Sequence, residues 1–395
     1  MQPDHPEQRL HRFNPEKPTR TLLPVFLYFL AAGVATVMLG PILPTLIRTW
    51  HIQDAQAGTL FTASFAGQFC GAWFATRNLR ASVLFGSAIT AAGCAAMAAA
   101  GFATAHIALF CIGLGLGAGL TAGNVIAGTV IPRARAKLIA LLNVAWGLGA
   151  IACPILVRLL SSGGIQRFFF AASALLAIAS VVSIAIPPTQ PPFPDDASPS
   201  LRTRMPLPLL QLSVFVAAIF LYVGVENALG GWLPSYAIRT SPSLHASSIS
   251  LYFWIAELTG RLLVTILMAL LGEALLYRFC VALLILTQIL LCAVAHLSTT
   301  SVITLTILAA LSLAPLYPLI LSFLLARTGR HARLGPLFAT ASLGGATLPW
   351  LTGVFSTHFH GLRAGLLIPA AGTVLLLFLS TIVTARPSSL STVSS

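Results

Sequence analysis

Residues 221–236, LYVGVENALGGWLPSY, decide how this chain folds. They lie inside an apolar run over approximately residues 209–238, which is long enough to cross a bilayer as a helix. Near the middle of the run, Glu226 stands beside Asn227. An ionised carboxylate in hydrocarbon is costly, so such a residue normally faces a protein interior or a water-filled cavity. We therefore expect a membrane helix that turns an ionisable group toward the centre of a bundle.

The same stretch contains a weak point in the expected helix. Gly230 and Gly231 allow close approach of another backbone, and Pro234 removes a hydrogen-bond donor and can kink the chain. Trp232 lies between them. We predict a helix that can bend next to Glu226, with the other segments forming the walls around that carboxylate.

The composition of the whole chain is that of an integral membrane protein. Of 395 residues, 57% are hydrophobic and 8% are charged, against about 25% charged in soluble domains. The apolar runs are continuous rather than alternating, which favours membrane helices over barrel strands. The net charge of +13 comes mostly from loop arginines, which orient a membrane protein, so no nucleic-acid partner is expected.

Twelve apolar segments are predicted to span the membrane. Their approximate ranges are 22–48, 55–76, 82–102, 105–131, 138–160, 167–187, 209–238, 247–271, 275–296, 301–326, 335–357 and 362–384. The stretch between the sixth and the seventh is polar and proline-rich, which predicts a flexible linker. The expected fold class is an all-α integral membrane protein. Two six-helix bundles (21–187 and 208–385) are joined by a cytoplasmic linker (188–207), with cytoplasmic tails at 1–20 and 386–395.

The distribution of arginine and lysine predicts the orientation in the membrane. With both termini in the cytoplasm, about 16 basic residues fall inside, in agreement with the positive-inside rule. Arg261 lies within a helix, and the five basic residues on the outside are Arg48, Arg158, Arg167, Arg239 and Arg363. We expect a monomeric multi-pass protein of a bacterial inner membrane, in contact with the lipid bilayer.

The two halves of the chain carry related patterns. The fifth segment reads LLNVAWGLGAIACPILV (141–157) and the eleventh reads LFATASLGGATLPWLTG (337–353), each with a small-residue cluster about four residues before a proline. The first segment contains GPILPTL (40–46) and the seventh contains GGWLPSY (230–236). Two related six-helix halves are the layout of a parallel-repeat transporter.

With these motifs the chain resembles a major facilitator superfamily transporter over essentially its whole length. It is most similar to the fucose–galactose–glucose:proton symporter group, on YVGVENALGGWLPSYA (222–237), the pattern from Leu142 to Pro154, TGR (259–261) and GLGAGLTAGNV (115–125). The resemblance implies a secondary transporter, not an enzyme, that moves a small polar solute such as a sugar by alternating access. A drug/proton efflux antiporter and a facilitator without proton coupling are the alternatives.

The chain departs from that group in its acidic residues. The region after the second segment, GAWFATRNLR (71–80), lacks the aspartate usual in the superfamily. Leu120 stands where sugar–proton relatives have an acid shortly before the residue matched by Asn124, and the first segment has no acid. If transport is coupled to protons, the proton carrier lies elsewhere.

Two glutamates are therefore the candidate charged site. Glu257 has Arg261 four residues on, one helical turn away, as either a neutralising ion pair or a charge-exchange gate. Glu226 has no cation within a helical turn, and burial disfavours the charged form of a carboxyl group. It is interpreted as a proton- or substrate-binding residue, and the alternative is a neutral acid that joins two helices.

Scattered amide and aromatic side chains predict a polar cavity. Amide groups can bind solute hydroxyls and aromatic faces can cover the apolar face of a sugar ring, although each residue alone could equally be interhelical glue. No cofactor and no metal site is expected. The proposed lining residues are Gln68, Asn124, Asn143, Trp146, Asn227, Trp232 and Tyr317.

The topology leads to a direct prediction. Tags at both termini, and a cysteine introduced by Ser198→Cys in the linker, should be accessible only from the cytoplasm, because the arginine and lysine asymmetry places them there. Labelling of the Ser198→Cys variant in intact cells by a membrane-impermeant maleimide would contradict the orientation.

Overall fold

The computed structural model describes residues 18–75, 78–131, 134–187, 209–294, 296–328 and 335–384. The predicted linker 188–207 and the predicted tail 386–395 lie outside these residues, as does most of the predicted tail 1–20. All of the long elements in the described part of the chain are α-helices, which satisfy their backbone hydrogen bonds internally as a membrane requires.

The α-helices coincide with the twelve predicted segments. Three consecutive pairs, α1 with α2, α11 with α12, and α14 with α15, each belong to a single apolar span. Within the described residues, nine spans are long and apolar enough to cross a membrane. In chain order the helices are α1 (Pro18–Val37), α2 (Leu39–Trp50), α3 (Asp54–Phe74), α4 (Leu79–Met97), α5 (Phe102–Val130), α6 (Arg135–Leu160), α7 (Ile165–Ser183), α8 (Leu209–Thr240), α9 (Ala246–Leu271), α10 (Glu273–Ala293), α11 (Thr299–Leu313), α12 (Leu316–Thr328), α13 (Gly335–His358), α14 (Leu362–Gly365) and α15 (Leu367–Val383).

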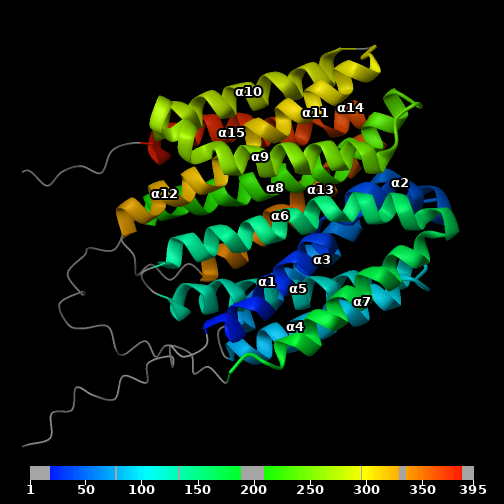
Figure 1. Ribbon diagram of the computed structural model, residues 1–395. Helices are drawn as coiled ribbons and strands as arrows, with labels where there is room; N and C mark the ends of the chain where they lie inside the picture. Colours follow the sequence, from blue (N-terminus) through cyan, green and yellow to red (C-terminus); the bar gives the residue numbers. More distant parts are fainter. Residues whose placement is uncertain are drawn as a thin grey trace, which may run out of the picture.

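The helices form one bundle in which they run back and forth along a common direction (Figure 1). We call the end where α7 ends and α8 begins the α7–α8 end, and the opposite end, where α2 ends at Trp50 and α3 begins at Asp54, the α2–α3 end. Helices α4 and α7 lie on one side of the bundle, and α10 and α11 lie on the other (Figure 1).

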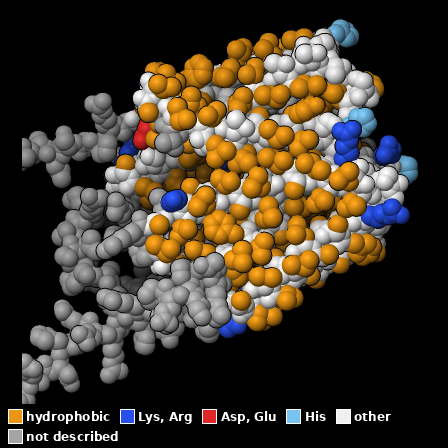
Figure 2. All heavy atoms as spheres, viewed as in Figure 1, with side chains coloured by type: hydrophobic (Ala, Val, Ile, Leu, Met, Phe, Trp, Pro, Cys, Tyr) orange, Lys and Arg blue, Asp and Glu red, His pale blue; other side chains and the backbone are white. Residues whose placement is uncertain are grey.

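Apolar side chains cover the outer surface of the bundle. Figure 2 shows them across the middle of the visible face, with arginine, lysine and histidine side chains near its ends. Leu210 and Phe378 are 71% and 70% exposed, which would be unfavourable in water and is suited to lipid. The chain is therefore built to lie in a bilayer.

The same neighbour pairs recur in the two halves of the chain. Helix α1 packs on α6, α3 on α5 and α4 on α7; in the second half, α8 packs on α13, α9 on α11 and α10 on α15. Between the halves, α3 packs on α13 and α6 packs on α9. This pairing is what a repeated six-helix unit predicts.

Glycines bring the paired helices close together at equivalent points. A Cβ atom on Gly149 of α6 would overlap the Leu30 carbonyl oxygen of α1, and a Cβ atom on Gly344 of α13 would overlap the Phe220 carbonyl oxygen of α8. Small residues at such crossings allow the backbones to approach, which is how membrane helices gain packing energy. Each of these glycines precedes a proline by the same interval, as in the sequence patterns of the fifth and eleventh segments.

One break interrupts the first membrane span, whereas α8 is continuous. The first span is interrupted at Met38, between α1 and α2, just before Gly40 and Pro41. Helix α8 instead continues from Leu209 to Thr240 with Pro234 inside it, so the helix is not interrupted beside Glu226. Tight contacts with α2 and α13 hold this part of α8 in place.

Candidate functional site

A single arginine joins two carboxylates at the centre of the bundle. Nη2 of Arg261, on α9, lies 2.6 Å from Oε1 of Glu226 on α8 and 2.5 Å from Oε1 of Glu257 on α9. The side chains of Arg261, Glu226 and Glu257 are 19%, 11% and 2% exposed, so water screens these charges poorly. We call these three residues the charge triad.

Two tyrosines complete the surroundings of Glu226. The Tyr222 hydroxyl donates a 2.7 Å hydrogen bond to Oε1 of Glu226, one turn along α8, and Arg261 Nη2 donates to the Tyr222 oxygen at 3.3 Å. The Tyr317 ring, on α12, lies 5.4 Å from the Tyr222 ring. Tyr222 was missed from the sequence, although its position four residues before Glu226 on the same helix was a usable signal.

Arg261 links the two glutamates that the sequence analysis treated separately. The predicted contact between Glu257 and Arg261 is present. Glu226 has no cation within a helical turn of α8, but Arg261 reaches it from the neighbouring helix α9. The two residues are 35 positions apart, so no local pattern reveals their contact. The separate roles given to Glu226 and to the Glu257–Arg261 pair therefore merge into one site.

The charge triad is unbalanced. Two carboxylates face one guanidinium, and both approach the same nitrogen while Arg261 Nε has no hydrogen-bond partner. The Glu257 contact is an ion pair without good hydrogen-bond geometry, since its Oε1 accepts no hydrogen bond from the described residues. Burying a net negative charge is costly, so the triad lacks one positive charge for full compensation.

Aromatic side chains connect the triad to the first half of the chain. The Arg261 guanidinium carbon lies 5.4 Å from the ring centroid of Trp146 on α6, within range of a cation–π interaction. Trp146 packs edge to face on Trp254 of α9, with centroids 5.7 Å apart, and its Nε1 donates to Thr36 Oγ1 at 3.4 Å. The charges therefore lie where the two halves meet.

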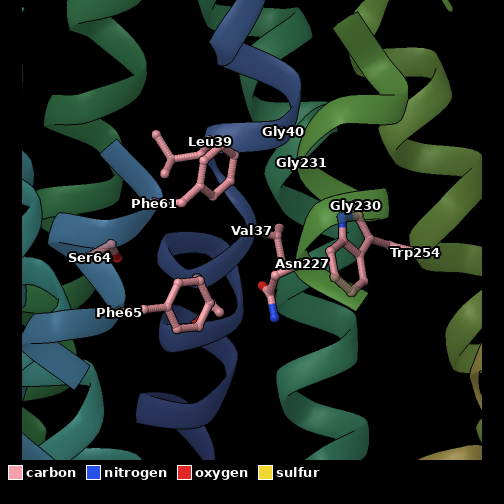
Figure 3. Close-up of a pocket in the computed structure, with 11 residues that line it drawn as sticks. Val37, Leu39, Gly40, Phe61, Ser64, Phe65, Asn227, Gly230, Gly231 and Trp254 are labelled. Carbon is pink, nitrogen blue, oxygen red and sulfur yellow. The ribbon is translucent and has the colours of Figure 1, made fainter. Parts of the chain in front are cut away.

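A small cavity is lined by Asn227 and Gly230, which lie within about one helical turn of Glu226 along α8, toward the α2–α3 end. Its volume is about 10 Å³, which is room for about one water molecule. Asn227 and Trp254 line it from α8 and α9, while Phe61 and Phe65 line it from α3 (Figure 3). The other lining residues are Thr36, Val37, Leu39, Gly40, Ser64, Gly230 and Gly231.

Two hydrogen-bonding groups in this cavity are available to a ligand. The indole N–H of Trp254 is buried and makes no hydrogen bond with the described residues. Asn227 uses its Nδ2 to donate to the Val223 carbonyl oxygen at 2.8 Å, which leaves its carbonyl oxygen as an acceptor. A donor and an acceptor therefore lie on one wall of the cavity, with phenylalanine rings opposite.

The predicted residues Gln68, Asn124, Asn143 and Trp232 do not line this small cavity. Asn124 and Asn143 donate to Leu120 and Ile139 carbonyl oxygens in their own helices. Trp232 is fully buried and donates to the Pro349 carbonyl oxygen of α13 at 2.9 Å, so it fastens α8 to α13. Gln68 lies at the α3–α5 contact, where its backbone meets Gly117. The geometry thus concentrates the site on Trp146, Asn227 and Tyr317 around the charge triad.

An ion pair that the sequence analysis missed closes the α2–α3 end. Asp54, at the start of α3, is 10% exposed and accepts two 2.7 Å hydrogen bonds from Arg239 at the end of α8. Ser356 of α13 donates to the same carboxylate at 2.5 Å, and Thr357 accepts a 2.8 Å bond from the Ala55 amide. We call Asp54, Arg239 and Ser356 the end clamp, because they join the first half to the second.

Glycine contacts close the same end sterically. A Cβ atom on Gly40 of α2 would overlap the Gly230 carbonyl oxygen of α8, and a Cβ atom on Gly58 of α3 would lie 2.9 Å from the Trp350 Cα of α13. Phe61 packs against Gly231 and, with ring centroids 6.1 Å apart, against Trp232. The cavity is therefore separated from the α2–α3 end by tight contacts between the halves.

This architecture defines a polytopic membrane transport protein, with a buried charged site between two sets of helices. Residues 25–335 match the family model described as Major Facilitator Superfamily, which is well over half of the chain. The chain belongs to the Major Facilitator Superfamily. The prediction of an all-helical transporter rather than an enzyme is confirmed.

One curated relative is "Bypass of stop codon protein 6" of Saccharomyces cerevisiae (strain ATCC 204508 / S288c). It is 24% identical over 276 residues, which are 59% of this chain and 54% of the relative. The chain thus matches about half the length of that protein.

Solved structures of several transporters share the fold. A bacterial homologue of the human lysosomal transporter Spinster has a TM-score of 0.69 at 15% identity, covering 92% of this chain and 95% of that one. The E. coli fucose:proton symporter FucP has a TM-score of 0.63 at 18% identity, covering 92% and 98%. The nucleoside transporter NupG has a TM-score of 0.69 at 14% identity, covering 92% and 99%. These likenesses establish the fold, and they do not single out the fucose–galactose–glucose:proton group.

The charge triad predicts a graded effect of substitution. Arg261→Ala leaves two buried carboxylates without a cation and should lower stability by about 3–5 kcal/mol. Adding Glu257→Gln should restore part of the loss, and adding Glu226→Gln as well should restore most of it, as measured by thermal unfolding in detergent. Arg158→Ala, at an exposed helix end, is the control. A triple variant no more stable than Arg261→Ala would refute the shared site.

The end clamp predicts a shift between conformations. Asp54→Asn should weaken closure at the α2–α3 end, and about 1 kcal/mol would change the ratio of states about fivefold. A Ser64→Cys reporter in the cavity should then react faster with an impermeant maleimide added from that side of oriented vesicles. Arg48→Gln, an exposed arginine at the same end, should leave the rate unchanged. Equal rates with and without Asp54→Asn would exclude a closing role for this carboxylate.

Proposed function

We propose that this protein is a proton-coupled secondary transporter of a small polar solute, of the sugar type, that works by alternating access. The observation that carries the proposal is the charge triad, in which two buried carboxylates share one guanidinium at the boundary between the halves. In this scheme Glu226 and Glu257 bind the transported proton, and Arg261 stays charged throughout.

Charge balance explains how proton binding would govern the cycle. With one carboxyl group protonated, the triad is neutral and can be enclosed between the halves at low cost. Without that proton the triad carries a net negative charge, which favours the conformation that admits water to it. In this scheme the protonated triad favours the closed conformation, and the unprotonated triad favours a conformation that is open to water.

The cavity supports a solute with hydroxyl groups and an apolar face. The unpaired Trp254 N–H can donate and the Asn227 carbonyl oxygen can accept, while Phe61 and Phe65 offer aromatic surface. The present volume of about 10 Å³ is too small for such a solute, so binding requires the halves to move apart. The fucose:proton symporter among the structural relatives agrees with a sugar-like substrate.

The second candidate is an exporter of amphipathic cations in exchange for protons. The observation that favours it is the excess negative charge of the triad next to a largely aromatic cavity, since a cation could take the place of the proton. In that case a lipophilic amine, and not a sugar, would compete with protons for Glu226 and Glu257.

The end clamp fits the outer gate of such a carrier. We place the α7–α8 end in the cytoplasm and the α2–α3 end outside, in a cell membrane, following the distribution of basic residues. Residues 21–187 and 208–385 would then move as two bodies, and opening to the outside would require Arg239 to leave Asp54.

Removal of one carboxylate separates exchange from accumulation. Glu226→Gln leaves one carboxylate for Arg261, so the triad is neutral without a proton. In proteoliposomes the variant should exchange labelled solute at a rate near that of the unchanged protein but lose accumulation driven by a pH gradient. Exchange needs only the loaded carrier to reorient, whereas accumulation needs the proton to be released.

The control for this experiment is Glu273→Gln. Glu273 lies at the α7–α8 end, where it accepts a 3.3 Å hydrogen bond from Ser322, and it should not affect accumulation. If Glu226→Gln still concentrates solute with an unchanged dependence on pH, the triad does not carry the coupled proton. If the proteoliposomes exchange lipophilic amines but not sugars, the second candidate is correct.

A further inference from the structure

A separate hollow lies away from the charge triad, at the α2–α3 end of the second half. It has a volume of about 260 Å³ between α10, α14 and α15. Its walls are apolar except for one arginine. The lining residues are Ile289, Cys292, Ala293, Arg363, Ala364 and Leu367.

The arginine in this hollow differs from its neighbours at the same end. Arg48, Arg158 and Arg167 are exposed, whereas Arg363 is half-buried against an apolar wall. A guanidinium partly withdrawn from water normally has an anion or several acceptors close by. The occupant of the hollow is therefore expected to carry negative charge.

The described part of the chain does not supply that charge. Asp54 is bound by Arg239, and Glu226 and Glu257 are bound by Arg261. Glu273, the remaining acid among the described residues, lies at the opposite end of the bundle. No described carboxylate thus pairs with Arg363. The Tyr236 hydroxyl interacts with its guanidinium but is neutral, which leaves the surrounding membrane as the source of the anion.

The position of the hollow matches a lipid molecule. Arg363 begins the last membrane span, Leu362–Val383, so its guanidinium lies at the depth of the lipid headgroups. Next to Arg363 in the hollow, Ile289 of α10 and Leu367 of α15 are 51% and 52% exposed. They form an apolar wall that faces the hydrocarbon. A phosphate at the arginine would place an acyl chain along this wall.

We propose that the hollow binds an anionic phospholipid of the outer leaflet, with its phosphate on Arg363 and an acyl chain between α10 and α15. This site is independent of the proposed transport cycle and links the two helices on the side of the bundle that faces lipid. A planar guanidinium can donate two hydrogen bonds to one phosphate, which favours arginine over lysine here.

Native mass spectrometry of the full-length protein in detergent tests the site. The protein is titrated with phosphatidylglycerol, with phosphatidylcholine and with inorganic phosphate. We expect the unchanged protein to bind one phosphatidylglycerol molecule about fivefold more tightly than the Arg363→Gln variant does. This is the difference in affinity expected for one arginine–headgroup contact. Arg167→Gln, at an exposed arginine of the same end, should bind like the unchanged protein.

A second variant tests the hollow without changing the charge. Ala293→Trp, at an exposed position on its wall, should fill the space and lower phosphatidylglycerol binding while keeping Arg363. Phosphatidylglycerol binding that is unchanged in both variants would overturn the proposal. Equal binding of phosphatidylcholine would also overturn it, because the anionic headgroup would then be irrelevant. Binding of inorganic phosphate alone, with phosphatidylglycerol excluded, would assign a free anion instead of a lipid.

Discussion

The buried contact between Arg261 and two glutamates is the constraint on which the rest of the structure depends. A guanidinium held near the middle of a membrane must be neutralised, and here the neutralising groups come from α8 and α9 together. The rotation of α8 and of α9 about their own axes is therefore fixed by the contact between these side chains. The ring of Trp146 lies with its centroid 5.4 Å from the guanidinium carbon and brings α6 of the first half into the same arrangement.

Around this centre, the bundle depends on close backbone contacts where side chains are absent. Gly149 and Gly344 draw α6 and α13 against α1 and α8 within each half, while Gly40 and Gly230 meet between the halves. Membrane helices gain little from hydrophobic contact with one another, because lipid tails are equally apolar, so packing and polar bonds must hold them. The end clamp supplies the polar bonds at the end where the glycines supply the packing.

Features that depend on short stretches of sequence were predictable. The twelve helical segments follow from the positions of the apolar runs, and the contact between Glu257 and Arg261 follows from a spacing of one helical turn. The contacts of Glu226 with Arg261 and of Asp54 with Arg239 were not predictable, because they depend on the rotation and pairing of helices distant in sequence. Asn124, Asn143 and Asn227 each donate to a carbonyl oxygen of their own helix, so the presence of an amide in a span does not by itself predict which of them lines a cavity.

The edge-to-face pair of Trp146 and Trp254 also gives the molecule an optical property. The indoles belong to different halves and their centroids are 5.7 Å apart at an interplanar angle of 84°. Two chromophores this close couple their electronic transitions, so they contribute a paired signal to the near-ultraviolet circular dichroism spectrum. The coupling falls steeply with separation and changes with angle. The protein therefore carries an intrinsic spectroscopic gauge of the distance between α6 and α9, which needs no attached probe.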